Sequence, residues 1–315
     1  MTKIVVTGST GFLGRHLMPK LNEIYGQNNV VGLSSKDFDL LQAEGVEMMF
    51  ELHKPDVIIH LAAYSGGIGA NRLYPADFFF KNSLFATLMF EAAARHGVAK
   101  MIYPMGGCSY PSTATSPISE DQMWNGYPQR ESAGYSIAKK MGIVLSESYR
   151  EQYGLNSVIL IPGNMYGEYD NFYVNESHVV PAMIRRYYEA KLQGQDTITM
   201  WGDGKPQRDF VYAGDVAKAI PWFIENYDSS APVNISTGTK ISIRKLAETI
   251  KEKMDWDGKI EWDTSKPNGQ MVKIFDVSRL NGLGLECNTT LACGLEKTIS
   301  WMSNHYLDRS DGIRL

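Results

Sequence analysis

The sequence predicts an α/β fold: a Rossmann-type doubly wound parallel sheet with a smaller, interleaved C-terminal α/β substrate lobe. Two observations predict it. In the first half of the chain, short runs of β-branched residues alternate with longer amphipathic stretches, a pattern typical of a parallel sheet covered by helices. The glycine-rich segment from Gly8 to Gly14 also follows the first of those runs directly and opens a helical pattern, as a nucleotide-binding turn does.

The strands expected in the large sheet are short, apolar and sparsely charged, which fits burial on both faces. Their ranges are Lys3–Thr7, Asn29–Leu33, Val57–His60, Lys100–Met105 and Asn156–Pro162. Longer amphipathic stretches between them predict helices at Phe12–Tyr25, Phe78–His96 and Tyr135–Tyr153.

The second half of the chain is less regular and predicts a second lobe. Helices are expected at Val180–Leu192, Ala213–Glu225, Ile241–Lys253 and Leu291–His305, and a strand at Thr197–Trp201. We expect residues 1–165, with about 208–230, to form the dinucleotide-binding domain. The substrate lobe then takes about 166–207 and 231–315, so the two parts are interleaved.

Composition excludes several classes of function. The 315 residues contain 31 basic and 35 acidic side chains, so no net charge favours nucleic acid or an anionic membrane. No segment resembles a signal peptide or a membrane span. Three scattered cysteines, Cys108, Cys287 and Cys293, predict neither a disulfide framework nor a metal site, and favour a reducing cytoplasm.

The glycine-rich turn predicts a dinucleotide site. Its glycines permit a tight turn and close backbone approach, so the following helix N-terminus faces a pyrophosphate. The alternative is a merely structural turn, which the strand before it and the helix after it make less favourable. The residues expected to contact the cofactor here are Gly8, Thr10, Gly11, Phe12, Leu13 and Gly14.

Two further segments complete the expected cofactor site. Ser34 and Lys36 follow the second strand, where NAD-preferring folds usually carry an acid on the ribose. A hydroxyl and a cation suit a 2′-phosphate, so NADP(H) is preferred, with NAD(H) and a solvated loop lysine as the alternatives. After the third strand, small residues allow the cofactor to lie against the backbone; these are Leu61, Ala62 and Ala63.

Tyr135 and Lys139 predict a catalytic pair. Their spacing of four places both side chains on one helical face, one turn apart. A lysine cation beside a phenol lowers the tyrosine pKa from about 10, so that the phenol donates a proton to a ketone as hydride arrives. The motif is common by chance, but its place on a helix after a nucleotide turn makes it specific.

Together these features resemble the extended short-chain dehydrogenase/reductases. Within them, several segments resemble the GDP-L-fucose synthases, from Gly8 to about Gly284. The segments are His60-Leu-Ala-Ala, Gly66-Gly67-Ile68, Cys108-Ser109-Tyr110-Pro111, Ser177-His178, Trp201-Gly202, Arg208-x-Phe210 and Ser265-Lys266-Pro267-x-Gly269. The resemblance implies an enzyme that epimerises C3 and C5 of a GDP-4-keto-6-deoxy-sugar and then reduces the C4 ketone with NADPH.

The resemblance implies that Cys108 and His178 are the acid–base pair of epimerisation. A thiol near a positive nicotinamide or a lysine has a lowered pKa and can remove a C–H proton beside a ketone. Histidine titrates near neutrality and can return a proton on the opposite face. The structural alternatives are an inert buried cysteine and a surface histidine.

The chain departs from the family at two positions. Gly106 stands where the family carries the serine or threonine that completes a Ser-Tyr-Lys triad, and strand alternation aims the nearby Ser109 away. Losing one donor to an oxyanion costs about 3–4 kcal/mol in an enzyme that relies on it. Thr10 replaces an arginine that the fucose synthases place at the 2′-phosphate, which weakens the prediction of NADP(H).

The resemblance also implies a nucleotide-sugar site and a homodimer. Arg208 matches the arginine that holds the diphosphate, for which a guanidinium is suited. Trp201 covers a base or sugar, or packs in the core. The further residues expected at cofactor or substrate are Pro162, Asn164, Arg186 and Lys273. Two other functions stay open: an epimerase that spares the C4 reduction, and a non-catalytic NADPH-binding sensor.

Overall fold

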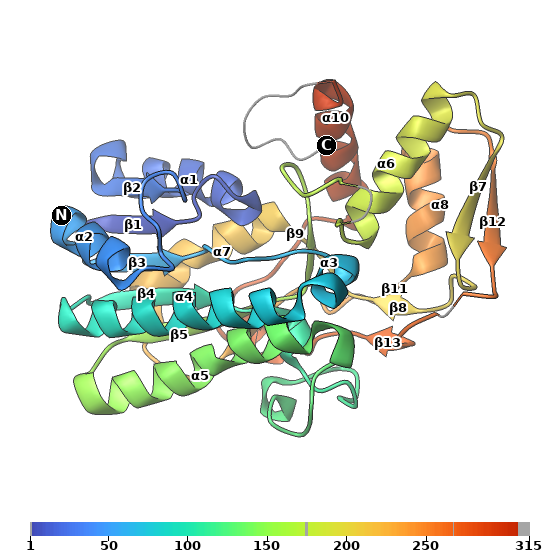
Figure 1. The fold of residues 1–315 in the computed structure, drawn as a ribbon. Coiled ribbons are helices and arrows are strands. Elements are labelled where there is room, and N and C mark those ends of the chain that lie inside the picture. The colour runs from blue at the N-terminus through green and yellow to red at the C-terminus, as the bar shows by residue number, and fades with distance from the viewer. Residues whose placement is uncertain (1, 174–175, 267, 308–315) are drawn as a thin grey trace.

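The structure is a computed structural model that describes residues 2–173, 176–266 and 268–307. Its centre is a six-stranded parallel sheet in the order β10-β5-β4-β3-β1-β2. Figure 1 labels β2, β1, β3, β4 and β5 of this sheet. The strands are β1 (Ile4–Thr7), β2 (Val30–Leu33), β3 (Val57–His60), β4 (Lys100–Pro104), β5 (Ser157–Pro162) and β10 (Val233–Ile235). The predicted doubly wound sheet is therefore confirmed, and each of the five expected strands lies within one residue of its predicted bounds.

The sixth strand was not predicted. β10 lies in a range assigned to the substrate lobe, yet it pairs with β5 at the edge of the large sheet. Three residues give no periodic signal, so only the pairing with β5 identifies the strand. The division of the remaining chain into two lobes stays a prediction.

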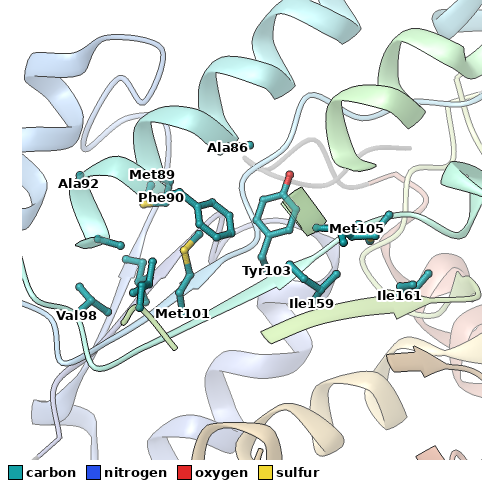
Figure 2. Packing of buried hydrophobic residues seen from close by; sticks show 14 of the residues in the cluster. Ala86, Met89, Phe90, Ala92, Val98, Met101, Tyr103, Met105, Ile159 and Ile161 are labelled. Carbon is teal, nitrogen blue, oxygen red and sulfur yellow. The ribbon is translucent and has the colours of Figure 1, made fainter. Parts of the chain in front are cut away.

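Helices cover both faces of the sheet. On one face lie α2 (Ala43–His53), α4 (Pro75–Arg95) and α5 (Ala133–Tyr153), and on the other α1 (Phe12–Tyr25) and α7 (Ala213–Asn226). Because each strand sends alternate side chains to opposite faces, two separate apolar cores form. Figure 2 shows the first core, where Met101 and Tyr103 of β4 lie beside Phe90 of α4.

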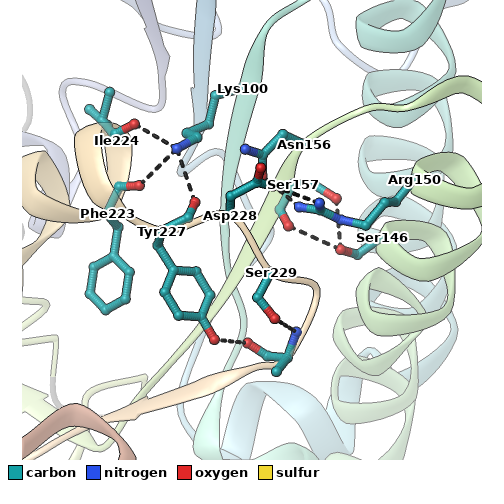
Figure 3. Close-up of polar contacts among 11 residues, drawn as sticks. Lys100, Ser146, Arg150, Asn156, Ser157, Phe223, Ile224, Tyr227, Asp228 and Ser229 are labelled. Atoms are coloured by element: carbon teal, nitrogen blue, oxygen red, sulfur yellow. Dashed lines mark hydrogen bonds and ion pairs between the residues drawn. The ribbon is translucent and has the colours of Figure 1, made fainter. Parts of the chain in front are cut away.

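Polar contacts fix the helices at the start of β4 and β5 (Figure 3). The Lys100 ammonium donates to the carbonyl oxygens of Phe223, Ile224 and Tyr227 at 3.3, 2.7 and 2.9 Å. A cation at these unpaired carbonyls stabilises the C-terminal end of α7. On the other face, the Ser146 hydroxyl of α5 contacts the Ser157 hydroxyl of β5 at 2.7 Å.

A second lobe lies beyond the C-terminal edge of the large sheet (Figure 1). Its helices α6 (Val179–Leu192), α8 (Ile243–Lys253) and α10 (Leu291–His305) share a third apolar core with β7 (Thr197–Trp201). The expected helix at Ile241–Lys253 begins two residues late, because Ile241–Ser242 form strand β11 and the Ser242 hydroxyl caps α8.

The remaining elements are short. They are α3 (Ile68–Leu73), α9 (Ser278–Gly282), β6 (Asn164–Tyr166), β8 (Gln207–Arg208), β9 (Phe210–Tyr212), β12 (Lys259–Asp263), β13 (Val272–Lys273) and 3₁₀ turns at Gln27–Asn29, Gly107–Ser109, Glu120–Gln122 and Arg130–Ser132. Across the described ranges, every helix is too short or too polar to cross a membrane.

Candidate active site

The turn between β1 and α1 has the shape of a dinucleotide cradle. Gly8 has φ of 73°, and a Cβ atom there would lie 2.7 Å from the Ala62 nitrogen, so only glycine fits. The Gly11 amide donates to the Gly8 carbonyl at 3.0 Å and closes the turn. Gly14 packs directly on the backbone of Ser9, which brings the first turn of α1 onto the loop. The residues present therefore fit a bound pyrophosphate.

A cavity of about 670 Å³ lies over this turn and the C-terminal ends of the strands. It brings together the four predicted catalytic residues and most predicted binding residues. Those that line it are Gly8, Thr10, Gly11, Phe12, Leu13, Gly14, Ser34, Leu61, Ala62, Ala63, Cys108, Tyr135, Lys139, Pro162, Asn164, His178 and Lys273. Four predicted residues lie outside its lining: Lys36, Arg186, Trp201 and Arg208.

The end of β2 carries an acid that the sequence analysis missed. The amide and the hydroxyl of Ser34 donate to Asp37 Oδ2 at 2.7 and 2.8 Å, and these bonds lower the pKa of Asp37. The Lys36 amide donates to the Ser34 hydroxyl oxygen at 3.2 Å. The bond from the Lys36 amide is that of a serine turn, in which the hydroxyl accepts from the backbone two residues on, and serine is favoured in such turns, so the sequence did contain a signal. Beside it, an apolar part of the cavity was also missed: Phe38, Leu40, Leu41 and Met49.

Tyr135 and Lys139 both enter the cavity from the first turns of α5. Burial raises the pKa of Tyr135, and the nearby charge of Cys108 raises it further. Burial lowers the pKa of Lys139 to about 7, and the charge of Cys108 opposes that shift. The prediction that the Tyr135 pKa is lowered is therefore wrong, because burial deprives a charged phenolate of its hydration. Tyr135 is a neutral phenol here, the form that donates a proton.

Cys108 lies in the 3₁₀ turn Gly107–Ser109 that follows β4, and it is half-buried. The preceding Gly106 lies against both the thiol and Tyr135. A Cβ atom on Gly106 would lie 3.1 Å from Cys108 Sγ and 3.2 Å from Tyr135 Cε1. Ser109 is fully buried and does not line the cavity, so its hydroxyl does not replace the missing triad donor.

His178 is exposed at the cavity and precedes the first residue of α6. It is therefore carried by helix α6, whereas Cys108 follows strand β4 of the large sheet. The Asn164 amide nitrogen, on β6, donates to the Asp209 carbonyl at 2.8 Å. This bond ties the cavity wall to the segment that carries Arg208.

Lys273 and Arg208 are direct neighbours on paired strands β13 and β8. Burial lowers the pKa of Lys273, and the charge of Cys108 opposes this while that of Arg208 adds to it. The adjacent Asp209 is fully buried and accepts the Thr237 hydroxyl at 2.7 Å and the Gly238 amide at 3.0 Å. Asp209 thus fixes the backbone beside Arg208, a supporting role that the sequence analysis missed.

The other two predicted substrate residues lie at the edge of the second lobe. Arg186 is exposed and donates to the Thr199 carbonyl at 2.9 Å. Trp201 is 69% exposed, so its alternative interpretation as a core residue is wrong. A large exposed aromatic ring is available for stacking on a base or sugar.

The comparisons with known proteins agree with this geometry. The model of the "NAD dependent epimerase/dehydratase family" matches residues 4–236. GDP-L-fucose synthase 1 of Arabidopsis thaliana is 37% identical over 307 residues, which are 98% of this chain and 95% of that relative. GDP-L-fucose synthase of Escherichia coli K12 is 33% identical, covering 99% of this chain and 98% of its own. A GDP-L-fucose synthetase from Naegleria fowleri, solved bound to NADP, is 28% identical with a TM-score of 0.88, covering 98% and 95% of the two chains. The chain therefore belongs to the NAD dependent epimerase/dehydratase family, in the group that includes the GDP-L-fucose synthases.

Proposed function

We propose that this protein is an NADPH-dependent 3,5-epimerase and 4-reductase of a GDP-4-keto-6-deoxy-sugar. One observation carries the proposal: Cys108, His178, Tyr135 and Lys139 line a single cavity above a dinucleotide cradle. The relatives named GDP-L-fucose synthases match nearly the whole chain, and the Naegleria fowleri relative binds NADP. Bound NADPH supplies the hydride, and the chain's own side chains handle the protons.

In the epimerisation, Cys108 removes the acidic proton beside the C4 ketone, and His178 returns one from the opposite side. The two residues come from different lobes, which suits attack on two faces of a sugar ring. In the reduction, the neutral Tyr135 phenol gives its proton to the C4 oxygen. The Lys139 ammonium beside it stabilises the phenolate that forms.

We assign the binding residues from where they lie relative to the glycine-rich turn and the cavity. Gly8, Thr10, Gly11, Phe12, Leu13 and Gly14 hold the pyrophosphate, with Ser34 and Lys36 at the 2′-phosphate. Arg208 and Lys273 hold the sugar diphosphate, since a guanidinium and an ammonium are neighbours there. Trp201 and Arg186 extend this site along the second lobe. Leu61, Ala62, Ala63, Pro162 and Asn164 complete the wall of the cavity.

We further propose a cytoplasmic homodimer. Helices α4 and α5 pack against each other and leave large apolar side chains exposed, among them Phe79, Phe80 and Val144. Such a surface supports pairing with a second copy. The cysteines Cys108, Cys287 and Cys293 are free, which suits a reducing compartment.

Gly106 favours a second function, that of an epimerase that does not reduce the C4 ketone. Glycine supplies no side-chain donor to the C4 oxygen, so hydride transfer has less stabilisation than proton exchange. One experiment separates the functions. The protein is incubated with GDP-4-keto-6-deoxy-mannose and NADPH in heavy water, following cofactor absorbance and deuterium uptake. NADPH oxidation with uptake supports the first function, and uptake alone supports the second. Cofactor binding with neither contradicts both and leaves a sensor.

A further inference from the structure

We propose that Tyr103, with His60 stacked on it, is a positioning residue that holds the charged ammonium of Lys139 beside Tyr135. This inference rests on the proposed function only for its catalytic consequence. Lys139 is 4% exposed, and its Nζ atom lies 4.1 Å from the centroid of the Tyr103 ring. A cation at this distance from an aromatic face is attracted to it, most strongly where water is excluded.

The ring belongs to a polar row that crosses three strands. Thr7 of β1 is the register partner of His60 of β3, and their side chains form a hydrogen bond of 2.8 Å between Oγ1 and Nδ1. Ile59 pairs with Ile102, so His60 and Tyr103 are the next neighbours along β3 and β4. Their rings stack at 5.9 Å with an interplanar angle of 21°. Thr7 thus orients His60, and His60 supports the ring.

His60 and Tyr103 are both neutral, so neither supplies a negative charge to the Lys139 ammonium. The attraction between the ammonium and the Tyr103 ring therefore matters more. Burial, together with the charge of Lys139, lowers the pKa of His60 to about 3, and burial raises the pKa of Tyr103. Among the described residues, the titratable groups that face Lys139 are Cys108 after β4, Tyr135 on α5, His60 on β3 and Tyr103 on β4. Only Cys108 supplies an opposing charge. The ring therefore provides a favourable contact for the ammonium that does not depend on the state of the thiol.

A glycine on α5 leaves space for the Tyr103 ring. Gly142 of α5 lies against it, and a Cβ atom there would overlap the ring and lie 2.8 Å from its Cδ1 atom. The ring centroids of Phe90 (α4) and Tyr103 are 5.6 Å apart. Figure 2 shows the two rings side by side. The Tyr103 hydroxyl is buried and has no hydrogen-bond partner among the described residues. The contact with Lys139 is made by the ring, so phenylalanine can replace tyrosine here.

The test measures the charge of Lys139 directly. NMR of lysine labelled with ¹³C at Cε, assigned by comparison with Lys139→Met, gives the pKa of Lys139 in the protein with NADPH bound. Tyr103→Leu removes the ring and is expected to lower this pKa by about one unit. Tyr103→Phe keeps the ring and is the matched control, expected to titrate as the wild type does. Gly142→Ala pushes the ring aside without removing it and is expected to shift the pKa in the same direction by less.

The same variants are then compared by the pH profile of ketone reduction. Because only the charged lysine assists Tyr135, the alkaline limb of kcat/KM moves to lower pH by the amount found in the NMR titration. An unchanged Lys139 pKa in both Tyr103→Leu and Gly142→Ala overturns the proposal, as does an equal shift in Tyr103→Phe. A wild-type protein that does not oxidise NADPH contradicts the proposed function instead, while the NMR titration still decides the role of Tyr103.

Discussion

The Cβ position of Gly106 lies 3.1 Å from the sulfur of Cys108. Contacts this short between a Cβ atom and another atom are rare in proteins. A side chain on residue 106 would therefore make the Cys108 thiol shift by a few tenths of an ångström. The same Cβ position lies 3.2 Å from Tyr135 Cε1, so Gly106 borders both Cys108 and Tyr135. The position that lacks a triad donor therefore directly borders the proposed base of epimerisation.

Gly106→Ser is expected to separate the two half-reactions. The new hydroxyl supplies a donor for the C4 oxygen, so NADPH oxidation is maintained or rises, by up to about 100-fold where this donor is limiting. Cys108 Sγ shifts by only a few tenths of an ångström to admit the new Cβ atom, so deuterium uptake at C3 and C5 is expected to change much less than NADPH oxidation does. Gly106→Ala crowds the thiol without adding a donor and is the control. Faster NADPH oxidation in the alanine variant as well is incompatible with a hydroxyl effect.

Tyr135→Phe is expected to lower hydride transfer by about 10² to 10⁴-fold, since the proton donor to the C4 oxygen is lost. Deuterium exchange at C3 or C5 persists, because Cys108 and His178 are unchanged. Single-turnover NADPH oxidation and mass spectrometry of the sugar measure the two steps. The Kd of NADPH serves as the control and stays near the wild-type value. A variant that still reduces the ketone normally shows that another group donates the proton.

Arg208→Met is expected to raise the KM of the nucleotide sugar by about tenfold or more with a smaller change in kcat, as loss of uniform phosphate binding does. The half-buried guanidinium lies beside Lys273, and together they form the proposed diphosphate site. Arg186→Met removes a cation that is exposed and already donates to the Thr199 carbonyl, and it serves as the comparison. If KM rises equally in both variants, Arg208 does not hold the diphosphate of the substrate in preference to Arg186.

Lys36→Met is expected to raise the KM of NADPH by about tenfold while leaving that of NADH nearly unchanged. The NADH measurement in the same variant is its internal control. Asp37 bears on the outcome, since its carboxylate accepts both Ser34 donors and adds a negative charge close to the proposed 2′-phosphate. If Lys36→Met affects both cofactors equally, the lysine does not read the 2′-phosphate.

Much of the fold was predictable because the signals are local. The short apolar runs of β1 and β3 and the amphipathic helix α1 carry their period in the sequence, and their observed bounds agree with the prediction. The glycine-rich turn was equally readable, since the positive φ of Gly8 and its contact with Ala62 admit no other residue. Strand β10 was not predicted, because three residues become a strand only by pairing with β5.

The sequence predicted which residues form the candidate site. It did not predict how deeply they are buried or which side chains from other elements contact them. Spacing along α5 places Tyr135 and Lys139 together, yet it does not show how deeply both are buried. That burial reverses the expected shift in the pKa of Tyr135. The contact of Lys139 with Tyr103 joins α5 to a strand 36 residues earlier, and only the packing of α5 on the sheet brings them together.

Finally, His60 is expected to make the protein acid-sensitive. Its pKa is about 3 in the folded protein, because burial excludes the charged form, against about 6.5 in an unfolded chain. Between these values the unfolded state binds one more proton, so the free energy of unfolding decreases as pH falls, by up to about 1.4 kcal/mol per pH unit. His60→Gln removes this contribution, and the variant's free energy of unfolding is expected to depend less steeply on pH between 6.5 and about 4.5. Urea unfolding at several pH values measures the slopes. His53→Gln, which replaces a less buried histidine, is expected to change the slope less; equal slopes for His60→Gln and the wild type contradict a neutral, buried His60.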